Sequence, residues 1–238
     1  MNLVRSLIFN ALFYLNTLFW LLVALPTFFM PYRAVLEVAK TWGRVNLILL
    51  RVAGVKFELR GSEKIPAGPL IVASKHQSTW ETTALMPLFD NPLFILKREL
   101  EWIPLFGWLL IKGRMVPVDR SGGSQALAKM TERARAEIAE GRQLIIFPEG
   151  TRRPAGAEPR YKYGVAHLYA AAGVPCLPIA LNSGVFWPRR SLKLRPGAVV
   201  VKILDPIMPG LDKDVFFERL QNVIETATAL LIAEADKT

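Results

Sequence analysis

The feature that most constrains this chain is an apolar run near its start. No charged residue occurs from Leu7 to Met30, a stretch of about 24 residues. At ~1.5 Å per residue, a helix of this length reaches ~36 Å, enough to cross a ~30 Å hydrocarbon core. A secretory signal peptide does not fit, because the run is too long and Pro31-Tyr32-Arg33 follows in place of a small-residue cleavage site. We therefore predict a membrane helix that Pro26 ends.

The next segment, residues 34–52, has a different pattern. Its charged residues share one helical face and its apolar residues another; they are Glu37, Lys40, Arg44 and Arg51 on the first, and Trp42, Val45, Leu49 and Val52 on the second. A basic amphipathic helix beside an apolar one predicts a two-helix, membrane-associated segment over residues 1–53. An ordinary core helix is the alternative for the second of them.

The orientation can be inferred from the flanking charges. One arginine, Arg5, precedes the apolar run, whereas four basic residues follow it closely. The positive-inside bias then places the remainder, residues 54–238, on the cytoplasmic side of a membrane. A single span and a hairpin that enters one leaflet both fit this pattern.

The remainder alternates between short β-type runs and helical patterns. The expected strands are 55–59, 70–73, 93–96, 115–118, 144–147, 176–181 and 198–203. The expected helices are 79–88, 122–140 and 215–233. Strands separated by helices predict an α/β fold, a central mostly parallel mixed β-sheet flanked by helices.

Charge and cysteine content exclude several classes of protein. The single cysteine, Cys176, rules out a disulfide scaffold, and with two histidines it cannot build a Cys/His zinc site. The formal net charge is +10. Residues 147–202 hold nine Lys or Arg against two Glu, so the excess belongs to one region. Such a region suits an anionic partner, for which nucleic acid, acidic lipid and phosphorylated substrates qualify.

The first chemical cluster follows the strand expected at 70–73. His76 lies just beyond that strand, and Glu81 comes five positions later at a helix start. A carboxylate beside an imidazole fixes its tautomer and raises the basicity of the free nitrogen, which can then take a proton from a hydroxyl. The alternative is a loop histidine, with Glu81 favouring the helix N-terminus electrostatically.

Three further clusters also lie at expected strand ends, where open α/β sheets place ligands. Phe147–Arg152 contains a turn glycine, Gly150, followed by Thr151 and Arg152, which are natural phosphate ligands. The other two clusters are Lys97-Arg98-Glu99-Leu100 and Val174-Pro175-Cys176-Leu177-Pro178. The Phe147–Arg152 cluster is weak alone, since a surface turn with solvated arginines is the alternative.

The four clusters in this order resemble the glycerolipid acyltransferase family. His76-Gln-Ser-Thr-Trp-Glu81 is similar to the family's first block, with Glu in place of the usual Asp. Residues 97–100 resemble the second block, Phe147–Arg152 matches the third without change, and Val174–Pro178 matches the fourth. The resemblance covers residues 70–182 and extends to the apolar N-terminal segment.

The resemblance implies transfer of a fatty acyl chain from a thioester to the sn-2 hydroxyl of 1-acyl-glycerol 3-phosphate, giving phosphatidic acid. It implies His76 as general base and Glu81 as its orienting partner. It assigns acceptor binding to residues of the second and third blocks, Lys97, Arg98, Glu149, Gly150, Thr151 and Arg152. The donor is acyl-CoA or acyl carrier protein, the other partners are lysophosphatidic acid and the phospholipid bilayer, and no bound cofactor, metal or nucleic acid is expected.

Other readings remain open on the sequence alone. One alternative is an acyltransferase of the same family with another acceptor, which is glycerol 3-phosphate, another lysophospholipid or an amino-acid lysolipid. Charge alone also fits a membrane-bound binder of nucleic acid or anionic lipid, and Glu81 in place of Asp fits an inactive family member. Trp102 and Trp108 suit an acyl-chain tunnel, a lipid-facing surface or the core equally.

Overall fold

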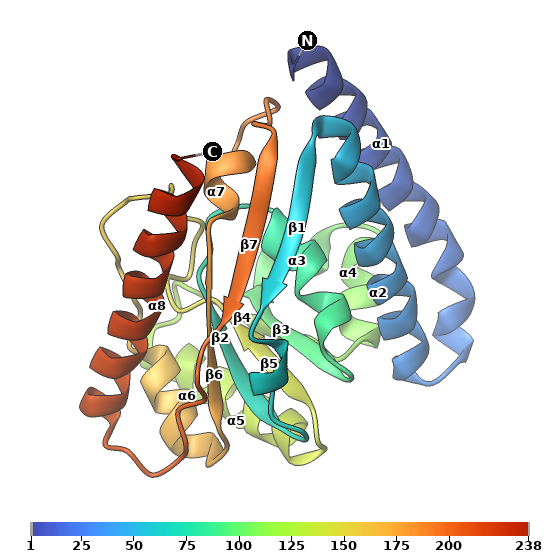
Figure 1. Cartoon of the computed structure of the whole chain (residues 1–238). Helices are drawn as coiled ribbons and strands as arrows, with labels where there is room; N and C mark the ends of the chain where they lie inside the picture. The colour runs from blue at the N-terminus through green and yellow to red at the C-terminus, as the bar shows by residue number, and fades with distance from the viewer. Residues whose placement is uncertain (1, 238) are drawn as a thin grey trace.

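The computed structural model describes residues 2–237 and contains a single seven-stranded sheet (Figure 1). The strand order is β1-β7-β6-β2-β5-β3-β4. The strands are β1 (Val55–Arg60), β2 (Leu70–Ser74), β3 (Pro92–Lys97), β4 (Val116–Val118), β5 (Gln143–Ile146), β6 (Cys176–Leu181) and β7 (Gly197–Ile203). All seven predicted strands are confirmed, with ends that shift by a residue or so.

Strand direction decides which loops meet. β6, β2, β5, β3 and β4 form a continuous parallel series, and the antiparallel pairing of β6 with β7 is the one reversal. β1 then pairs parallel to β7 and forms the edge of the sheet. The carboxyl ends of the five parallel strands therefore share one edge of the sheet, which confirms the mostly parallel mixed sheet.

Two groups of helices cover the sheet (Figure 1). α5 (Gly123–Ala139), α6 (Gly164–Ala172) and α8 (Lys213–Ala235) pack together, and α8 lies on β6. α2 (Tyr32–Leu49) packs against α1 (Asn2–Val23), α3 (Trp80–Ala84) and α4 (Phe106–Lys112). A further short helix, α7 (Ser183–Phe186), follows β6. The sheet's apolar strands, β2 and β6 above all, are buried throughout, as strands covered on both faces must be.

Helix boundaries depart from the sequence patterns in instructive ways. The helix expected at 79–88 is divided into α3 and a 3₁₀ turn, Met86–Leu88, because Pro87 cannot continue an α-helix. The sequence spacing of α8 predicts one apolar face, made of Phe216, Leu220, Val223, Ala227 and Leu230. Ala227 is buried as predicted, whereas Leu230 is exposed and Leu231 is buried in its place. The predicted face drifted because a 3.5-residue spacing does not follow a straight helix for five turns.

The N-terminal helices form an antiparallel pair joined by a 3₁₀ turn, Leu25–Phe29. α1 begins at Asn2 and ends at Val23, before Pro26 as predicted. Its inner face buries Phe9 and Phe13, whose rings pack edge-on against Trp187. The chain has one helical stretch, Leu3–Phe29, that is long and apolar enough to cross a membrane among the described residues.

The second helix is placed between α1 and the main sheet. Trp42 Nε1 donates to Thr17 Oγ1 across the pair, while Gly43 faces the backbone of Thr83 in α3. Lys40 points inward and is nearly buried, with its Nζ 2.6 Å from the Asp90 carbonyl oxygen. The charged face predicted for this segment is therefore not fully exposed. Lys40 belongs to it by spacing but is buried, because α2 is packed on two sides.

Candidate functional site

The loop that leaves β2 carries the first cluster to the common carboxyl edge. His76 is largely buried, and its ring stacks on Phe147 with centroids 3.8 Å apart. Its Nδ1 lies 3.6 Å from Glu81 Oε2. This separation suits an ion pair and is slightly longer than a hydrogen bond. The two predicted members of the dyad are thus side by side, with Nδ1 toward the carboxylate.

The Glu81 carboxylate is held by its own loop. It is fully buried and accepts the backbone N–H groups of Gln77 at 3.0 Å and of Ser78 at 3.0 and 3.1 Å. The Ser183 hydroxyl, at the start of α7, donates to Glu81 Oε1. Backbone and hydroxyl donors stabilise the ionised form of a buried carboxylate. The Glu81 carboxylate is therefore held in a fixed position beside His76.

A second clamp joins the same loop to α7. The Gly184 N–H donates to Gln77 Oε1 at 2.9 Å. A Cβ at position 184 would lie 2.8 Å from the Gln77 Cβ, so only glycine lets α7 come this close. The loops after β2 and β6 thus act as one unit around the carboxylate.

The third cluster lies against the first. The Arg153 N–H donates to the His76 carbonyl at 2.8 Å, and the His76 N–H donates to Glu149 Oε1 at 3.2 Å. Gly150 has a φ of 65°, which lets the chain turn here, and its N–H donates to the Phe147 carbonyl oxygen. The structure thus fastens the two clusters together through the backbone of His76.

Glu149 is the centre of a buried charge network. Lys75 Nζ lies 3.3 Å from Glu149 Oε1 and 2.7 Å from Glu225 Oε1, and Tyr161 donates to the same Glu225 oxygen at 2.9 Å. Burial raises the pKa of Glu149, and the nearby Lys75 opposes that rise. Glu149 Oε2 is buried with no partner among the described residues. The network ties α8 to the residue that precedes His76.

Arg152, in the third cluster, is half-buried and has no carboxylate ion pair in the described part of the chain. Burial lowers the pKa of its guanidinium, while the field of Glu81 acts in the opposite direction. Arg189 Nη1 donates to the Arg152 carbonyl at 2.6 Å and so holds the turn from the other side. An anion that enters here meets a half-buried guanidinium.

The remaining predicted residues lie at the same edge but without contact to the dyad. Lys97 ends β3, two strands from β2, and its Nζ is 3.0 Å from Glu99 Oε1. Arg98 pairs with Asp119 at 3.1 Å. Thr151 is exposed. The structure therefore brings His76, Glu81, Glu149 and Arg152 together and places Lys97, Arg98 and Thr151 around them.

Sequence reasoning missed three residues of this site. Ser183 lies two residues after the strand expected at 176–181, so its position near a carboxyl strand end was a signal. Lys75 adjoins His76, yet its partner Glu225 lies 150 residues away in α8. No local spacing indicates that partner.

The arrangement combines three groups. They are the His76 ring, whose Nε2 has no partner among the described residues, the Glu81 carboxylate beside its Nδ1, and the Arg152 guanidinium. Within residues 2–237, no group of three or more His, Cys, Asp or Glu side chains is placed to hold a metal ion. Such an arrangement suits proton abstraction from a hydroxyl of an anionic substrate.

Comparison with known proteins shows to which family the chain is similar. The family model described as "Acyltransferase" matches residues 56–182. A 1-acyl-sn-glycerol-3-phosphate acyltransferase of Pseudomonas aeruginosa is 40% identical over 181 residues, 75% of this chain and 70% of that protein. Another of the same name, from Cocos nucifera, is 29% identical over 220 residues, 91% of this chain and 70% of that protein.

A solved structure extends the likeness to almost the whole chain. The crystal structure of the 1-acyl-sn-glycerophosphate (LPA) acyltransferase PlsC from Thermotoga maritima covers 97% of this chain and 98% of that one, with a TM-score of 0.80 and 24% identity. This match shows the shared fold, N-terminal helices included. With a family model over more than half of its residues and a relative at 40% identity, the chain belongs to the acyltransferase family.

Proposed function

We propose that this chain acylates the sn-2 hydroxyl of 1-acyl-glycerol 3-phosphate and so forms phosphatidic acid. The observation that carries the proposal is the convergence of His76, Glu81 and Arg152 at one sheet edge. The names of the relatives, 1-acyl-sn-glycerol-3-phosphate acyltransferase, support the choice of acceptor.

In the proposed reaction, His76 Nε2 takes the proton of the acceptor hydroxyl as its oxygen attacks the thioester carbonyl. The C–S bond then breaks, and the thiol leaves after it takes a proton. Glu81 stabilises the imidazolium that forms, as a carboxylate held by backbone N–H groups can do. Because a thioester is already activated, no nucleophile of the enzyme is needed.

The phosphate of the acceptor binds Arg152 first in this proposal. Lys97 and Arg98 join it by exchanging their surface partners, Glu99 and Asp119, for phosphate oxygens. Exposed ion pairs are worth at most ~1 kcal/mol, so the exchange costs little. The Thr151 and Arg152 N–H groups, which have no partner among residues 2–237, are the proposed donors to the developing oxyanion.

Glu149 receives a second role beside the one that the resemblance implied. Its Oε1 is occupied by Lys75 and by the His76 N–H, which leaves Oε2 as the one atom for the glycerol part of the acceptor. We therefore assign Glu149 both to holding the His76 backbone and to the acceptor.

For the membrane, we propose a monotopic arrangement on the cytoplasmic side of the inner membrane. α1 is attached to the loop before β7 by Asn10 Nδ2, which donates to Leu192 O at 2.9 Å, and to the 3₁₀ turn after α2 by Arg5 Nε, which donates to Val52 O at 2.8 Å. A helix fastened along one face cannot leave the domain to cross a bilayer. Its opposite face is exposed and apolar, so it lies in one leaflet.

The test is an acceptor and donor panel with the purified full-length chain in detergent. Lysophosphatidic acid with acyl-CoA or acyl carrier protein thioester is compared with glycerol 3-phosphate and with lysophosphatidylcholine. Dependence of turnover on the phosphate monoester supports the proposal. Equal turnover of lysophosphatidylcholine would contradict it and favour a different acceptor.

A further inference from the structure

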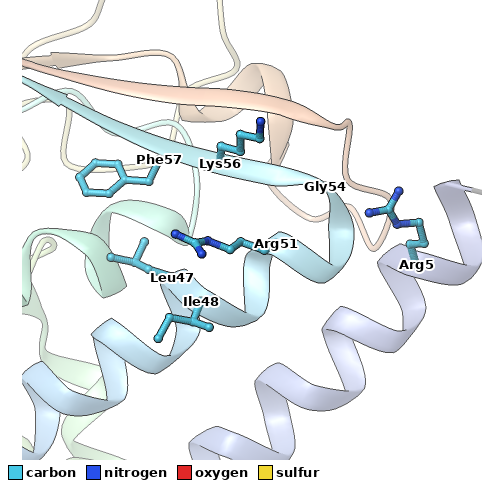
Figure 2. Close-up of a pocket in the computed structure, with 7 residues that line it drawn as sticks. All are labelled: Arg5, Leu47, Ile48, Arg51, Gly54, Lys56 and Phe57. Carbon is cyan, nitrogen blue, oxygen red and sulfur yellow. The ribbon is translucent and has the colours of Figure 1, made fainter.

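A cavity of about 530 Å³ lies away from the dyad, between the start of α1, the end of α2 and the first residues of β1 (Figure 2). It is lined by Arg5, Leu47, Ile48, Arg51, Gly54, Lys56 and Phe57. None of these residues belongs to the four sequence clusters. The cavity is therefore separate from the acceptor site proposed above.

The cavity collects positive charge from three different elements. Arg5 comes from α1, Arg51 from the 3₁₀ turn after α2, and Lys56 from β1. No carboxylate lines the cavity, and none of these cations has an ion pair within the described residues. Gathered cations without counter-charges attract an anion.

The geometry leaves these cations available. Arg5 uses Nε for the Val52 carbonyl, which fixes the guanidinium at the rim with its remaining N–H groups free of a described partner. In Figure 2, Arg51 extends through the space between α2 and β1. β1 pairs with β7 alone in the described sheet, so alternate N–H groups along its outer edge lack a strand partner. β1, which lines the cavity with Lys56 and Phe57, thus has one edge without a strand partner in the described sheet.

The other walls are apolar. Leu47 and Ile48 come from α2, and Phe57 packs on Trp80, the residue before Glu81, with ring centroids 5.3 Å apart. Ile48 is 61% exposed. The residues of α1 around Arg5 are exposed and apolar too; they are Leu3, Val4, Leu7 and Ile8. A ligand that satisfies both parts of the cavity has an anionic head and an apolar body.

We infer that this cavity binds the phosphate headgroup of an anionic phospholipid of the bilayer, in addition to the acceptor at the catalytic site. Arg5, Arg51 and Lys56 hold the phosphate, and the acyl chains lie along Ile48 and the exposed face of α1. A free phosphate ion would leave the apolar walls in water, which is why the lipid is the occupant. The inference does not depend on which acceptor is acylated.

The experiment is co-sedimentation of the full-length chain with two kinds of vesicle, one of phosphatidylcholine alone and one with a minority of phosphatidylglycerol, without acyl donor. The double variant Arg51→Gln/Lys56→Gln is compared with Lys129→Gln/Arg133→Gln, which removes the same charge from the exposed face of α5. Juxtamembrane cations each contribute about 1 kcal/mol to such partitioning, which is about fivefold, so the first variant should lose about 30-fold on the anionic vesicles. The control should lose less than about threefold.

Three outcomes would overturn the inference. Equal losses in both variants would mean diffuse surface charge. Displacement by inorganic phosphate at matched ionic strength, to the same extent as by soluble short-chain phosphatidylglycerol, would mean a simple ion site. Self-association of the wild type in detergent that the cavity variant abolishes would mean that β1 adds a second chain at its edge.

A separate readout keeps this test apart from the proposed function. In neutral detergent micelles, the cavity variant should keep wild-type acylation of lysophosphatidic acid, since its residues do not belong to the catalytic site. Absence of acylation in every variant and the wild type would sink the proposed function while leaving the vesicle result interpretable.

Discussion

His76 is fixed on two sides, by the face of Phe147 and by the buried Glu81 carboxylate. We expect His76→Ala to lower kcat by ~10²- to 10⁴-fold, which is the range for loss of a general base. The measurement is initial-rate acylation of lysophosphatidic acid. Circular dichroism should show an unchanged fold, and a variant within a factor of ten of wild type would remove His76 from this role.

Ser183 is the donor that local sequence did not reveal. Its hydroxyl donates to Glu81, which is fully buried. Ser183→Ala removes a hydrogen bond to a buried charge, so we expect a loss of about 1.5–3 kcal/mol of unfolding free energy. We also expect a lower kcat, because Glu81 loses one of the groups that hold it beside His76. Ser124→Ala, on the exposed surface of α5, is the matched control for chemical denaturation.

Glu149 gives the stability of the molecule a defined pH dependence. Burial raises its pKa above the ordinary value of 4.5, so in the window between 4.5 and the raised value the folded chain keeps a proton that the unfolded chain loses. Stability contributed by this proton is present below the window and is lost as the pH rises through it. In urea titrations at a series of pH values, the free energy of unfolding of Glu149→Gln should fall less across this window than that of the wild type. Glu158→Gln, at an exposed position, should leave it unchanged, and parallel curves for wild type and Glu149→Gln would contradict the assignment.

At the scale of elements, α1 presents an exposed apolar stripe along its outer face. The stripe consists of Leu3, Val4, Leu7, Ile8, Tyr14, Leu15, Leu18, Phe19, Leu22 and Val23. We expect Leu15→Glu/Phe19→Glu to move the chain from the membrane fraction to the soluble fraction, because each side chain contributes about 1.5–3 kcal/mol when it leaves water. The control, Val215→Glu/Leu230→Glu, alters exposed apolar residues of α8. An unchanged distribution for the α1 variant would mean that another surface binds the bilayer.

The contact between α2 and α3 depends on one glycine. A Cβ on Gly43 would lie 2.4 Å from the Thr83 carbonyl oxygen, a backbone atom that cannot move aside without shifting α3. Gly43→Ala should therefore cost about 1–3 kcal/mol of stability. Since Glu81 belongs to α3, kcat should fall as well. Thermal denaturation checks the first effect, and Arg44→Ala, at the neighbouring exposed position, should leave both unchanged.

Element prediction was accurate where hydrophobic periodicity is long. The seven strands and the helix at 122–140 follow from alternating or 3.6-residue patterns that tertiary packing then reinforces. α4 and α7 were missed because seven and four residues are too few to establish a period. Trp102 and Trp108 were left undecided between core and surface, and both are exposed. Residue type alone does not decide between core and surface, because aromatic side chains occur in both.

For the molecule as a whole, the catalytic edge was predictable because parallel strands bring their carboxyl ends together. His76 and Arg152 lie where that rule places them. The Lys75–Glu225 pair was not predictable, because it depends on how α8 crosses the sheet at a separation of 150 residues. The same limit applies to the cavity beside β1, whose cations come from residues 5, 51 and 56 and meet only in the folded chain.

The attachment of α1 along one face has a consequence for the growth of the bilayer. Asn10 and Arg5 fasten this helix to the loop before β7 and to the 3₁₀ turn after α2, and in the proposed monotopic arrangement the chain reaches one lipid monolayer only. Lipid made by such an enzyme accumulates on one side and expands that side relative to the other. Balanced expansion of the membrane then requires a separate process that moves lipid across it at a rate matched to synthesis.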